Sequence, residues 1–327
     1  MTVNFSKFSS LTNKVIDEVE RAVVGKRPLL EKIMAAILVS GGHLLLEDYP
    51  GLGKTLIANS FARSLGLDFR RIQFTPDLLP GDITGGYIFN RSKNSFELHK
   101  GPIFANIILA DEINRASPKT QSALLEAMQE QQVTLEGETM RLPEPFIVIA
   151  TQNPLEYEGT FPLPEAQLDR FIMKLSVGYP TEDVEQAIIR RRHKRKQDTF
   201  DLERVATADA LLEMRREVEK VHIDPALEAY IVAIITKTRR NRQLTVGASP
   251  RGSLALLLLS RAWAALQERD YVIPDDIKHF VIPALQHRLI LDSDLWLTQG
   301  ASAEIITKII NGTPVPVVEE SANGRRF

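Results

Sequence analysis

The chain has 327 residues, of which 44% are hydrophobic and 25% charged, so a disordered or low-complexity protein is excluded. Its 40 Lys and Arg nearly balance 42 Asp and Glu, and the net charge of −2 argues against nucleic acid as a partner, while the absence of cysteine excludes disulfides and thiolate chemistry. The first ten residues hold no apolar signal core, and no apolar run approaches the roughly 18 residues that span a bilayer, so we expect a cytoplasmic protein.

Residues 27–180 alternate short apolar runs with amphipathic stretches, a pattern typical of a parallel sheet covered by helices. Three runs are strand candidates, at residues 43–46, 106–110 and 146–150. Each is rich in Ile, Leu or Val and ends abruptly in polar residues. Because open α/β sheets bind ligands beyond the carboxyl ends of their strands, we expect the functional site at those polar ends.

The first strand candidate is followed by a glycine-containing loop and then by a helical pattern. This arrangement resembles a phosphate-binding loop, in which Gly51 and Gly53 let backbone amides approach phosphate oxygens. Lys54 would reach the β and γ phosphates of ATP, and the Thr55 hydroxyl would ligate Mg²⁺. The alternative is an ordinary strand-to-helix turn with a surface lysine. The residues expected at the nucleotide are Pro50, Gly51, Leu52, Gly53, Lys54, Thr55 and Leu56.

Asp48 stands where the phosphate-loop pattern usually has a glycine, five residues before Gly53. Aspartate tolerates left-handed backbone better than most residues. Its carboxylate must nevertheless point away from the nucleotide, because otherwise its charge would weaken ATP binding.

The other two strand candidates end in residues suited to phosphate hydrolysis. Asp111 would hold a water ligand of Mg²⁺, and Glu112 would polarise the water that attacks the γ-phosphate. Asn153, at the end of the third strand candidate, could orient that water. Taken alone, two acids after a strand are often a solvated turn, and an asparagine before Pro154 is often a turn former.

After Pro180 the composition changes, because apolar residues recur at helical spacing from about residue 202 to 310 and no strand run stands out. We therefore predict an all-helical second domain. Residues 76–98 and 131–141 read as insertions into the first domain, the latter a hairpin that turns at Glu136-Gly137. The expected organisation is an α/β domain over residues 1–190, a helical lid over 191–311 and a flexible tail over 312–327.

Residues 190–196 form a strongly basic run, Arg-Arg-Arg-His-Lys-Arg-Lys. It could grip phosphates of a nucleic acid. However, it closes a helical pattern that opens at Thr181 with three acids, which is the charge order that the helix dipole prefers. We favour a solvated helix end or an inter-domain linker.

Four segments together resemble the MoxR family of AAA+ ATPases, with a match from about residue 23 to 291. The resemblance implies a P-loop NTPase core of the AAA+ type, followed by a helical lid, with the nucleotide between the two. It also implies roles for single residues: Lys54 and Thr55 in Walker A, Asp111 and Glu112 in Walker B, and Asn153 as sensor 1. The segments are GKT, IILADEINRASPKTQSALLEAMQE, IATQNPLEYEGTFPLPEAQLDRF and GASPRGS.

Two arginines and an adenine contact complete what the resemblance implies. Arg170 matches an arginine finger that reaches a neighbouring subunit's γ-phosphate, and Arg251 matches sensor 2 on the lid. Val24 and Gly25 match residues that contact adenine. Arg251 would occupy the first turn of a helix, where the dipole disfavours a cation unless an anion is near. Each arginine could instead be an ordinary surface residue.

The resemblance implies a homo-oligomeric ring, expected to be a hexamer, that couples ATP hydrolysis to chaperone-like remodelling of client protein complexes. Partners with a von Willebrand factor A domain are expected among them. Two alternatives remain at this stage: a nucleic-acid motor or loader of the same fold, and a nucleotide-gated binding module without useful turnover.

Overall fold

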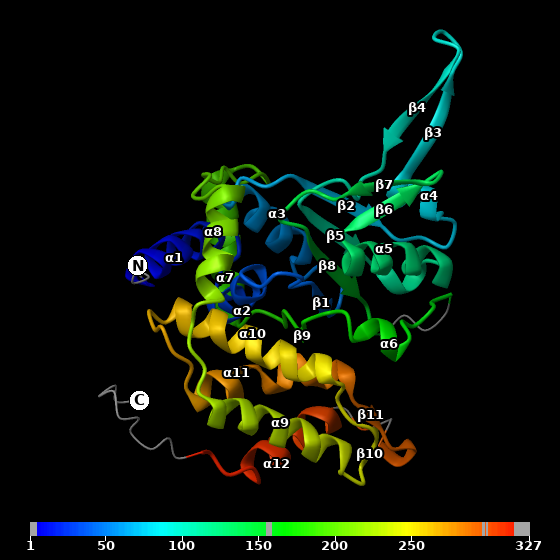
Figure 1. Ribbon diagram of the computed structural model, residues 1–327. Coiled ribbons are helices and arrows are strands. Elements are labelled where there is room, and N and C mark those ends of the chain that lie inside the picture. The colour runs from blue at the N-terminus through cyan, green and yellow to red at the C-terminus, as the bar shows by residue number, and fades with distance from the viewer. Residues whose placement is uncertain (1–4, 155–158, 296–297, 299, 317–327) are drawn as a thin grey trace.

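The computed structural model describes residues 5–154, 159–295, 298 and 300–316. They form an α/β part and a helical part that pack directly on one another, with the helical part below the sheet in Figure 1. A parallel five-stranded sheet in the order β2-β5-β8-β1-β9 lies at the centre of the first part. The predicted α/β class with a helical lid is confirmed. The strands are β1 (Leu44–Glu47), β2 (Phe69–Gln73), β5 (Ile107–Asp111), β8 (Ile147–Gln152) and β9 (Met173–Leu175).

Helices cover both faces of the sheet because side chains alternate along each strand. On β1, Leu44 and Leu46 join one apolar core and Leu45 joins the other. The first core is closed by α1 (Phe5–Ala22), α2 (Arg27–Ile37) and α3 (Lys54–Ser64). The second is closed by α4 (Pro80–Thr84) and α5 (Pro118–Glu130).

The three predicted strands exist, but each lies one or two residues further along the chain than the apolar run indicated. Backbone pairing continues into the polar ends, as in the partners Glu47 and Gln152 and the partners Gln73 and Asp111. Pairing depends on backbone groups and not on side-chain polarity, so the apolar pattern ended too early.

Both predicted insertions contain an antiparallel hairpin. The first holds β3 (Gly85–Asn90) and β4 (Ser95–Lys100), which project away from the rest of the chain in Figure 1. The second holds β6 (Gln132–Leu135) and β7 (Glu138–Arg141). Its turn lies at Glu136 and Gly137, both with positive φ, as predicted and as a two-residue hairpin turn requires.

The helical part is not purely helical, so this prediction was wrong in one respect. A small antiparallel sheet joins β10 (Leu244–Val246) to β11 (Ile290–Leu291). Strands of three and two residues are too short to leave an alternating pattern in the sequence. The remaining helices are α6 (Glu165–Leu168), α7 (Glu182–Arg195), α8 (Ala208–Val218), α9 (Pro225–Arg239), α10 (Pro250–Leu266), α11 (Pro274–Leu285) and α12 (Ala301–Asn311), with 3-10 turns at Ile113–Arg115, Gln286–Arg288 and Ser293–Leu295.

The expected domain boundary at residue 190 falls inside α7, and we propose the segment between α7 and α8 as the boundary instead. Of the expected tail, residues 312–316 are neither helix nor strand, and residues 317–327 lie outside the described chain. Among the described residues, no helix combines the length and apolar character that a membrane crossing requires.

The two parts share one continuous apolar core. The cluster that contains Leu44 and Leu46 of the sheet extends through α1 and α2 into α10 and α11. A hydrogen bond from the Ser9 hydroxyl to the carbonyl of Leu266 (3.0 Å) ties α1 to the end of α10. The helical part is therefore fixed against the α1–α3 side of the sheet.

Candidate active site

The loop between β1 and α3 has the backbone of a phosphate cradle. Gly51 and Gly53 both have φ of 82°, a conformation that favours glycine. Gly53 precedes the first turn of α3 and offers no side chain to cap it. The amides of that turn are thus open to an anion, which the helix dipole also favours.

Lys54 is held across this loop. Its Nζ donates to the carbonyl oxygens of Asp48 (2.6 Å) and Tyr49 (3.0 Å). Burial lowers the pKa of Lys54, although the nearby carboxylates of Asp48, Asp111 and Glu112 oppose that shift. The ammonium group is therefore positioned beside the cradle.

Asp48 points away from the cradle, as the sequence analysis required. Its Oδ2 accepts hydrogen bonds from the Ser176 hydroxyl (2.7 Å) and the Gly178 amide (2.6 Å), and Oδ1 accepts from the Tyr49 amide (2.9 Å). Burial alone would raise the pKa of this carboxyl, but those hydrogen bonds outweigh burial and lower it. Asp48 thus anchors the loop to the segment after β9.

Asp111 lies buried at the end of β5 with both carboxylate oxygens engaged. Oδ1 accepts from the Thr151 hydroxyl (2.6 Å), and Oδ2 accepts from Nη2 (2.6 Å) and Nε (3.0 Å) of Arg71 on the neighbouring strand β2. The Thr151 hydroxyl also accepts from the amide of Glu112 (2.8 Å). One hydroxyl therefore aligns both acids at the sheet edge.

Glu112 adopts a left-handed backbone (φ 56°, ψ 50°), which is uncommon for a residue other than glycine. Its Oε2 accepts from Nε2 of Gln73 (2.8 Å) and from Nη1 of Arg115 (2.9 Å). Strained backbone of this kind is concentrated at functional sites.

The phosphate loop and the strand ends line one cavity of about 420 Å³, a size typical of small-ligand sites. The predicted juxtaposition of Lys54, Thr55, Asp111, Glu112 and Asn153 is present there. Hydroxyl and carboxylate oxygens are ligands that suit Mg²⁺, so Thr55 and Asp111 fit that ion. The cavity is lined by Pro50, Gly51, Leu52, Gly53, Lys54, Thr55, Leu56, Arg71, Asp111, Glu112, Thr151 and Asn153.

Val24 and Gly25, expected at adenine, lie between α1 and α2 and are not among the residues that line this cavity. Gly25 has φ of 69°, and a Cβ there would lie 2.6 Å from Cγ2 of Val184 on α7. A side chain here would be strained by the backbone and would displace Val184, which favours glycine at this position. The contact of Gly25 with adenine stays a prediction.

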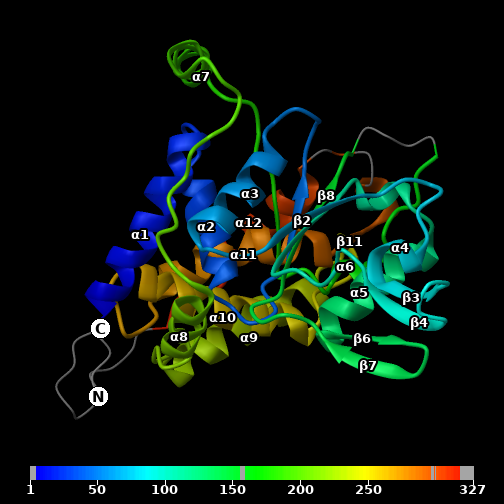
Figure 2. The same cartoon turned by 90° about the horizontal axis from the view of Figure 1, so that it is seen from above.

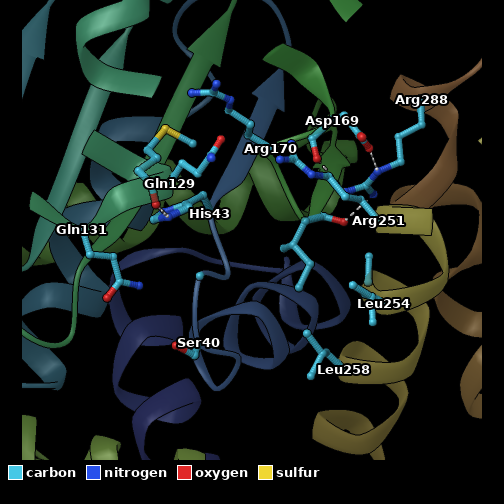
Figure 3. Close-up of a pocket in the computed structure, with 14 residues that line it drawn as sticks. Ser40, His43, Gln129, Gln131, Asp169, Arg170, Arg251, Leu254, Leu258 and Arg288 are labelled. Atoms are coloured by element: carbon cyan, nitrogen blue, oxygen red, sulfur yellow. Dashed lines mark hydrogen bonds and ion pairs between the residues drawn. The ribbon is translucent and has the colours of Figure 1, made fainter. Parts of the chain in front are cut away.

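Arg170 and Arg251 line a different cavity, of about 270 Å³, with Arg288 (Figure 3). Arg288 pairs with Asp169, whereas neither Arg170 nor Arg251 has a carboxylate partner among the described residues. The Nε of Arg170 is buried without a hydrogen-bond partner there. Guanidinium groups are common ligands of anions, so these two arginines, which lack a carboxylate partner in the described part of the chain, could bind one together.

The position of Arg251 corrects one expectation. Ser249 caps α10 and Pro250 begins it, as predicted, and the Ser249 hydroxyl accepts from the amide of Arg251 (3.1 Å). However, none of the lid residues that the structure describes lines the cavity at the phosphate loop. The cavity at the phosphate loop is therefore formed by the core, and the lid packs on the α1–α3 side of the sheet.

Sequence reasoning missed the residues that hold the site in place. Arg71 and Gln73 lie on β2, which is too polar to be recognised as a strand by an apolar run. Thr151 precedes Asn153 at the end of β8, but only Asn153 was predicted as a site residue. The sequence did contain a signal for β2, because Arg71 and Gln73 stand at alternate positions and therefore on one face of a strand. This strand pairs with β5, which ends at Asp111.

The basic run ends α7, which stands away from the rest of the chain in Figure 2 and buries none of its residues. Several of its cations have local partners. Arg191 donates to the carbonyls of Glu20 (3.2 Å) and Arg21 (3.4 Å), and the Arg195 guanidinium lies 3.8 Å from the centre of the Phe200 ring. These contacts support the reading as a helix end that continues into a linker.

Comparisons with known proteins agree with this geometry. Residues 43–173 match a model described as "ATPase family associated with various cellular activities (AAA)", and residues 236–309 match a model of the AAA lid domain. The chain is 42% identical over 314 residues to Chaperone MoxR1 of Mycobacterium tuberculosis, covering 93% of this chain and 82% of that protein.

Two further relatives extend over nearly the whole chain. It is 49% identical over 308 residues to the protein YeaC of Bacillus subtilis, covering 94% of this chain and 95% of that one. The crystal structure of a "putative ATPase" from Cytophaga hutchinsonii has a TM-score of 0.89 and 41% identity, covering 96% of this chain and 97% of that chain.

Proposed function

Because this chain belongs to the MoxR family of AAA+ ATPases, we propose that it hydrolyses ATP at a site shared by two copies of the chain. ATP would bind in the cavity at the phosphate loop. A neighbouring copy would supply Arg170 and Arg251 from its own second cavity.

One observation carries this proposal: the two cavities are chemically complementary and neither is complete. The first holds the phosphate cradle, Lys54 and the acids Asp111 and Glu112. The second holds two guanidinium groups without carboxylate partners among the described residues. If the second cavity of one copy lay against the first cavity of another, the two guanidinium groups would face the phosphates bound at the phosphate loop.

The residues then divide the work of hydrolysis. Glu112 would accept a proton from the attacking water as the water oxygen bonds to the γ-phosphorus and the bond to the β,γ-bridging oxygen breaks, and Asn153 would orient that water. Lys54 and the two arginines would stabilise negative charge on the phosphate oxygens. Before this, Glu112 would have to leave its hydrogen bonds to Gln73 and Arg115.

Mg²⁺ is the cofactor that this site fits, and Thr55 and Asp111 would hold it. When bound, it would neutralise charge on the β and γ phosphates. The contact of Arg71 with Asp111 occupies one carboxylate oxygen, so loading would change this ion pair.

A mixing experiment tests the shared site. Lys54→Ala should lose its own nucleotide site but keep the arginines, and Arg170→Ala should keep its site but lack one of them. Each variant alone should be nearly inactive, whereas the mixture should regain turnover. Wild-type turnover by Arg170→Ala alone, or no recovery in a mixture that co-assembles, would refute the proposal.

We further propose that hydrolysis drives chaperone-like remodelling of client protein complexes, in a ring expected to be a hexamer. The relative MoxR1 is named a chaperone, and the β3–β4 hairpin exposes Phe89, Phe96 and Ile88 on a projecting arm. Clients with a von Willebrand factor A domain belong to this proposal. Affinity capture with Glu112→Gln in ATP should enrich a defined protein partner, which is lost on Lys54→Ala, and recovery of nothing specific would count against it.

A further inference from the structure

We infer that Asp169 is the centre of a latch that positions both Arg170 and Arg251 for use by a neighbouring copy. The latch consists of Asp169, Ser249 and Arg288, and it joins the core to the lid. This inference rests on the proposed function, because it assigns a positioning role to residues beside the shared site.

Asp169 connects three chain segments that are far apart in sequence. Its Oδ2 accepts from the Ser249 hydroxyl (2.8 Å), and its Oδ1 accepts from Nε of Arg288 (2.7 Å). Figure 3 shows Asp169 next to Arg288 and between the parts of the chain that carry Arg170 and Arg251. A single carboxylate thus faces both domains.

Arg288 closes the latch from the lid. Its side chain is 3% exposed, and its guanidinium donates to the carbonyls of Phe171 (2.7 Å), Ile172 (3.1 Å) and Asp169 (3.2 Å). A buried guanidinium with this many partners cannot change them without a large loss of hydrogen bonding. The latch therefore fixes the start of β9 against the lid.

The latch residues lie directly beside the two arginines in the chain. Asp169 immediately precedes Arg170, and Ser249 caps the helix whose first turn contains Arg251. Fixing Asp169 to Ser249 consequently sets the separation of the two arginines, although they belong to different domains. The core and lid of one chain would then act as a single rigid donor, and nucleotide-driven motion would occur between copies.

The test isolates donation by placing each latch variant on a chain whose own site is inactive. Asp169→Asn combined with Lys54→Ala is mixed with Arg170→Ala, so turnover reports only on the donated arginines. We expect about 10- to 100-fold less turnover than with Lys54→Ala alone, since small displacements of catalytic groups have effects of that order. In the reverse arrangement, Asp169→Asn is placed on the Arg170→Ala chain, which accepts the arginines, and this chain is mixed with Lys54→Ala. The turnover of this mixture should equal that of Arg170→Ala mixed with Lys54→Ala.

The chain offers a matched control for simple loss of stability. Asp276 forms a similarly buried pair with Arg269 in the lid (2.6 Å), and it lines neither cavity. Asp276→Asn on the Lys54→Ala chain should donate normally, although it also removes a buried carboxylate. If the Asp169→Asn chain does not assemble, Ser249→Ala replaces it in the test. This variant keeps the ion pair between Asp169 and Arg288, and it should lower turnover only when it is on the donor chain.

The outcomes separate the latch from the shared site. Three outcomes would overturn the latch. The Asp169→Asn and Ser249→Ala chains could both donate as well as Lys54→Ala alone, or Asp169→Asn could lower turnover equally on the donor and on the acceptor. Alternatively, Asp276→Asn on the donor could lower turnover as much as Asp169→Asn does. If Lys54→Ala and Arg170→Ala themselves fail to complement, the proposed function fails instead.

Discussion

At the scale of single residues, hydrogen bonds hold both acids at the edge of the sheet. Glu112 is strained in the left-handed region and bonded to Gln73 and Arg115, while Asp111 is bonded to Arg71 and Thr151. These contacts keep two carboxylates in place at the sheet edge. In the proposed reaction, Glu112 would exchange them for the attacking water molecule.

Glu112→Gln should lower the ATP turnover number by about 10²- to 10⁴-fold, because an amide cannot accept the proton from water. Affinity for an ATP analogue should change little, since the phosphate cradle and Lys54 are intact. Turnover and fluorescent-nucleotide binding measure the two effects. Glu126→Gln, at an exposed position on α5, serves as the control and should behave like the wild type.

Because His43 is buried, we expect the free energy of unfolding to depend on pH in the acid range. Burial lowers its pKa from 6.5 to about 4, and the ring bonds to the carbonyl of Met128 (3.2 Å) and the amide of Val148 (3.0 Å). Between these pKa values the unfolded chain binds more protons, so the free energy of unfolding should fall as pH falls from about 6.5 to about 4. Urea unfolding across this window should show a shallower pH slope for His43→Gln, and His279 and His287, whose pKa values burial also lowers, contribute to the slope that remains. An unchanged slope would contradict the prediction.

At the scale of elements, the lid helices depend on defined caps. α11 begins after Ile273, whose amide donates to Oδ2 of Asp276 (2.8 Å). Asp276 also accepts from Nη1 (2.8 Å) and Nη2 (2.6 Å) of Arg269. A buried carboxylate thus joins the helix start to the end of α10, which makes this corner of the lid sensitive to substitution.

Asp276→Asn should reduce the free energy of unfolding by about 2–4 kcal/mol, because it leaves Arg269 without its charge partner. Asp275→Asn is the matched control. Its side chain is 78% exposed and pairs with Lys278 at the surface, so its effect should stay within about 0.5 kcal/mol. Urea titration measures the free energy of unfolding of both variants. Equal losses in Asp276→Asn and Asp275→Asn would contradict the prediction.

At the scale of the whole molecule, the phosphate loop and the arginines Arg170 and Arg251 line two separate cavities of one chain. The lid shares an apolar core with the α1–α3 side of the sheet and is latched through Arg288. Arg251 therefore faces the cavity of Arg170 and not the phosphate loop of its own chain. Activity should then be a property of the assembly.

Turnover per chain should fall steeply on dilution of the wild type, because dissociated copies lose the donated arginines, which can contribute about 10³ to 10⁵ in rate. Arg170→Ala should give the low rate at every concentration. Mass measurements at the same concentrations would relate the rate to the size of the assembly. A wild-type rate per chain that is independent of concentration, with single chains dominant, would contradict this.

The amino-acid sequence by itself determined the local chemistry of the site. The phosphate loop, the acids Asp111 and Glu112 and the cap at Ser249 each depend on residues close together in the chain, where backbone conformation and helix or strand ends follow from short patterns. Their meeting at one sheet edge also followed, because parallel strands end on the same side.

Only the tertiary structure decided which groups from distant segments face one another. Asp48 is held by Ser176 and Gly178, and Asp169 by Arg288, across 128 to 130 and 119 residues respectively. The cavity that Arg251 faces depends on how the lid packs, and that orientation results from many weak apolar contacts spread over both domains. No short pattern encodes such a sum, so the placement of Arg251 and the phosphate loop at two separate cavities became visible only in the folded chain.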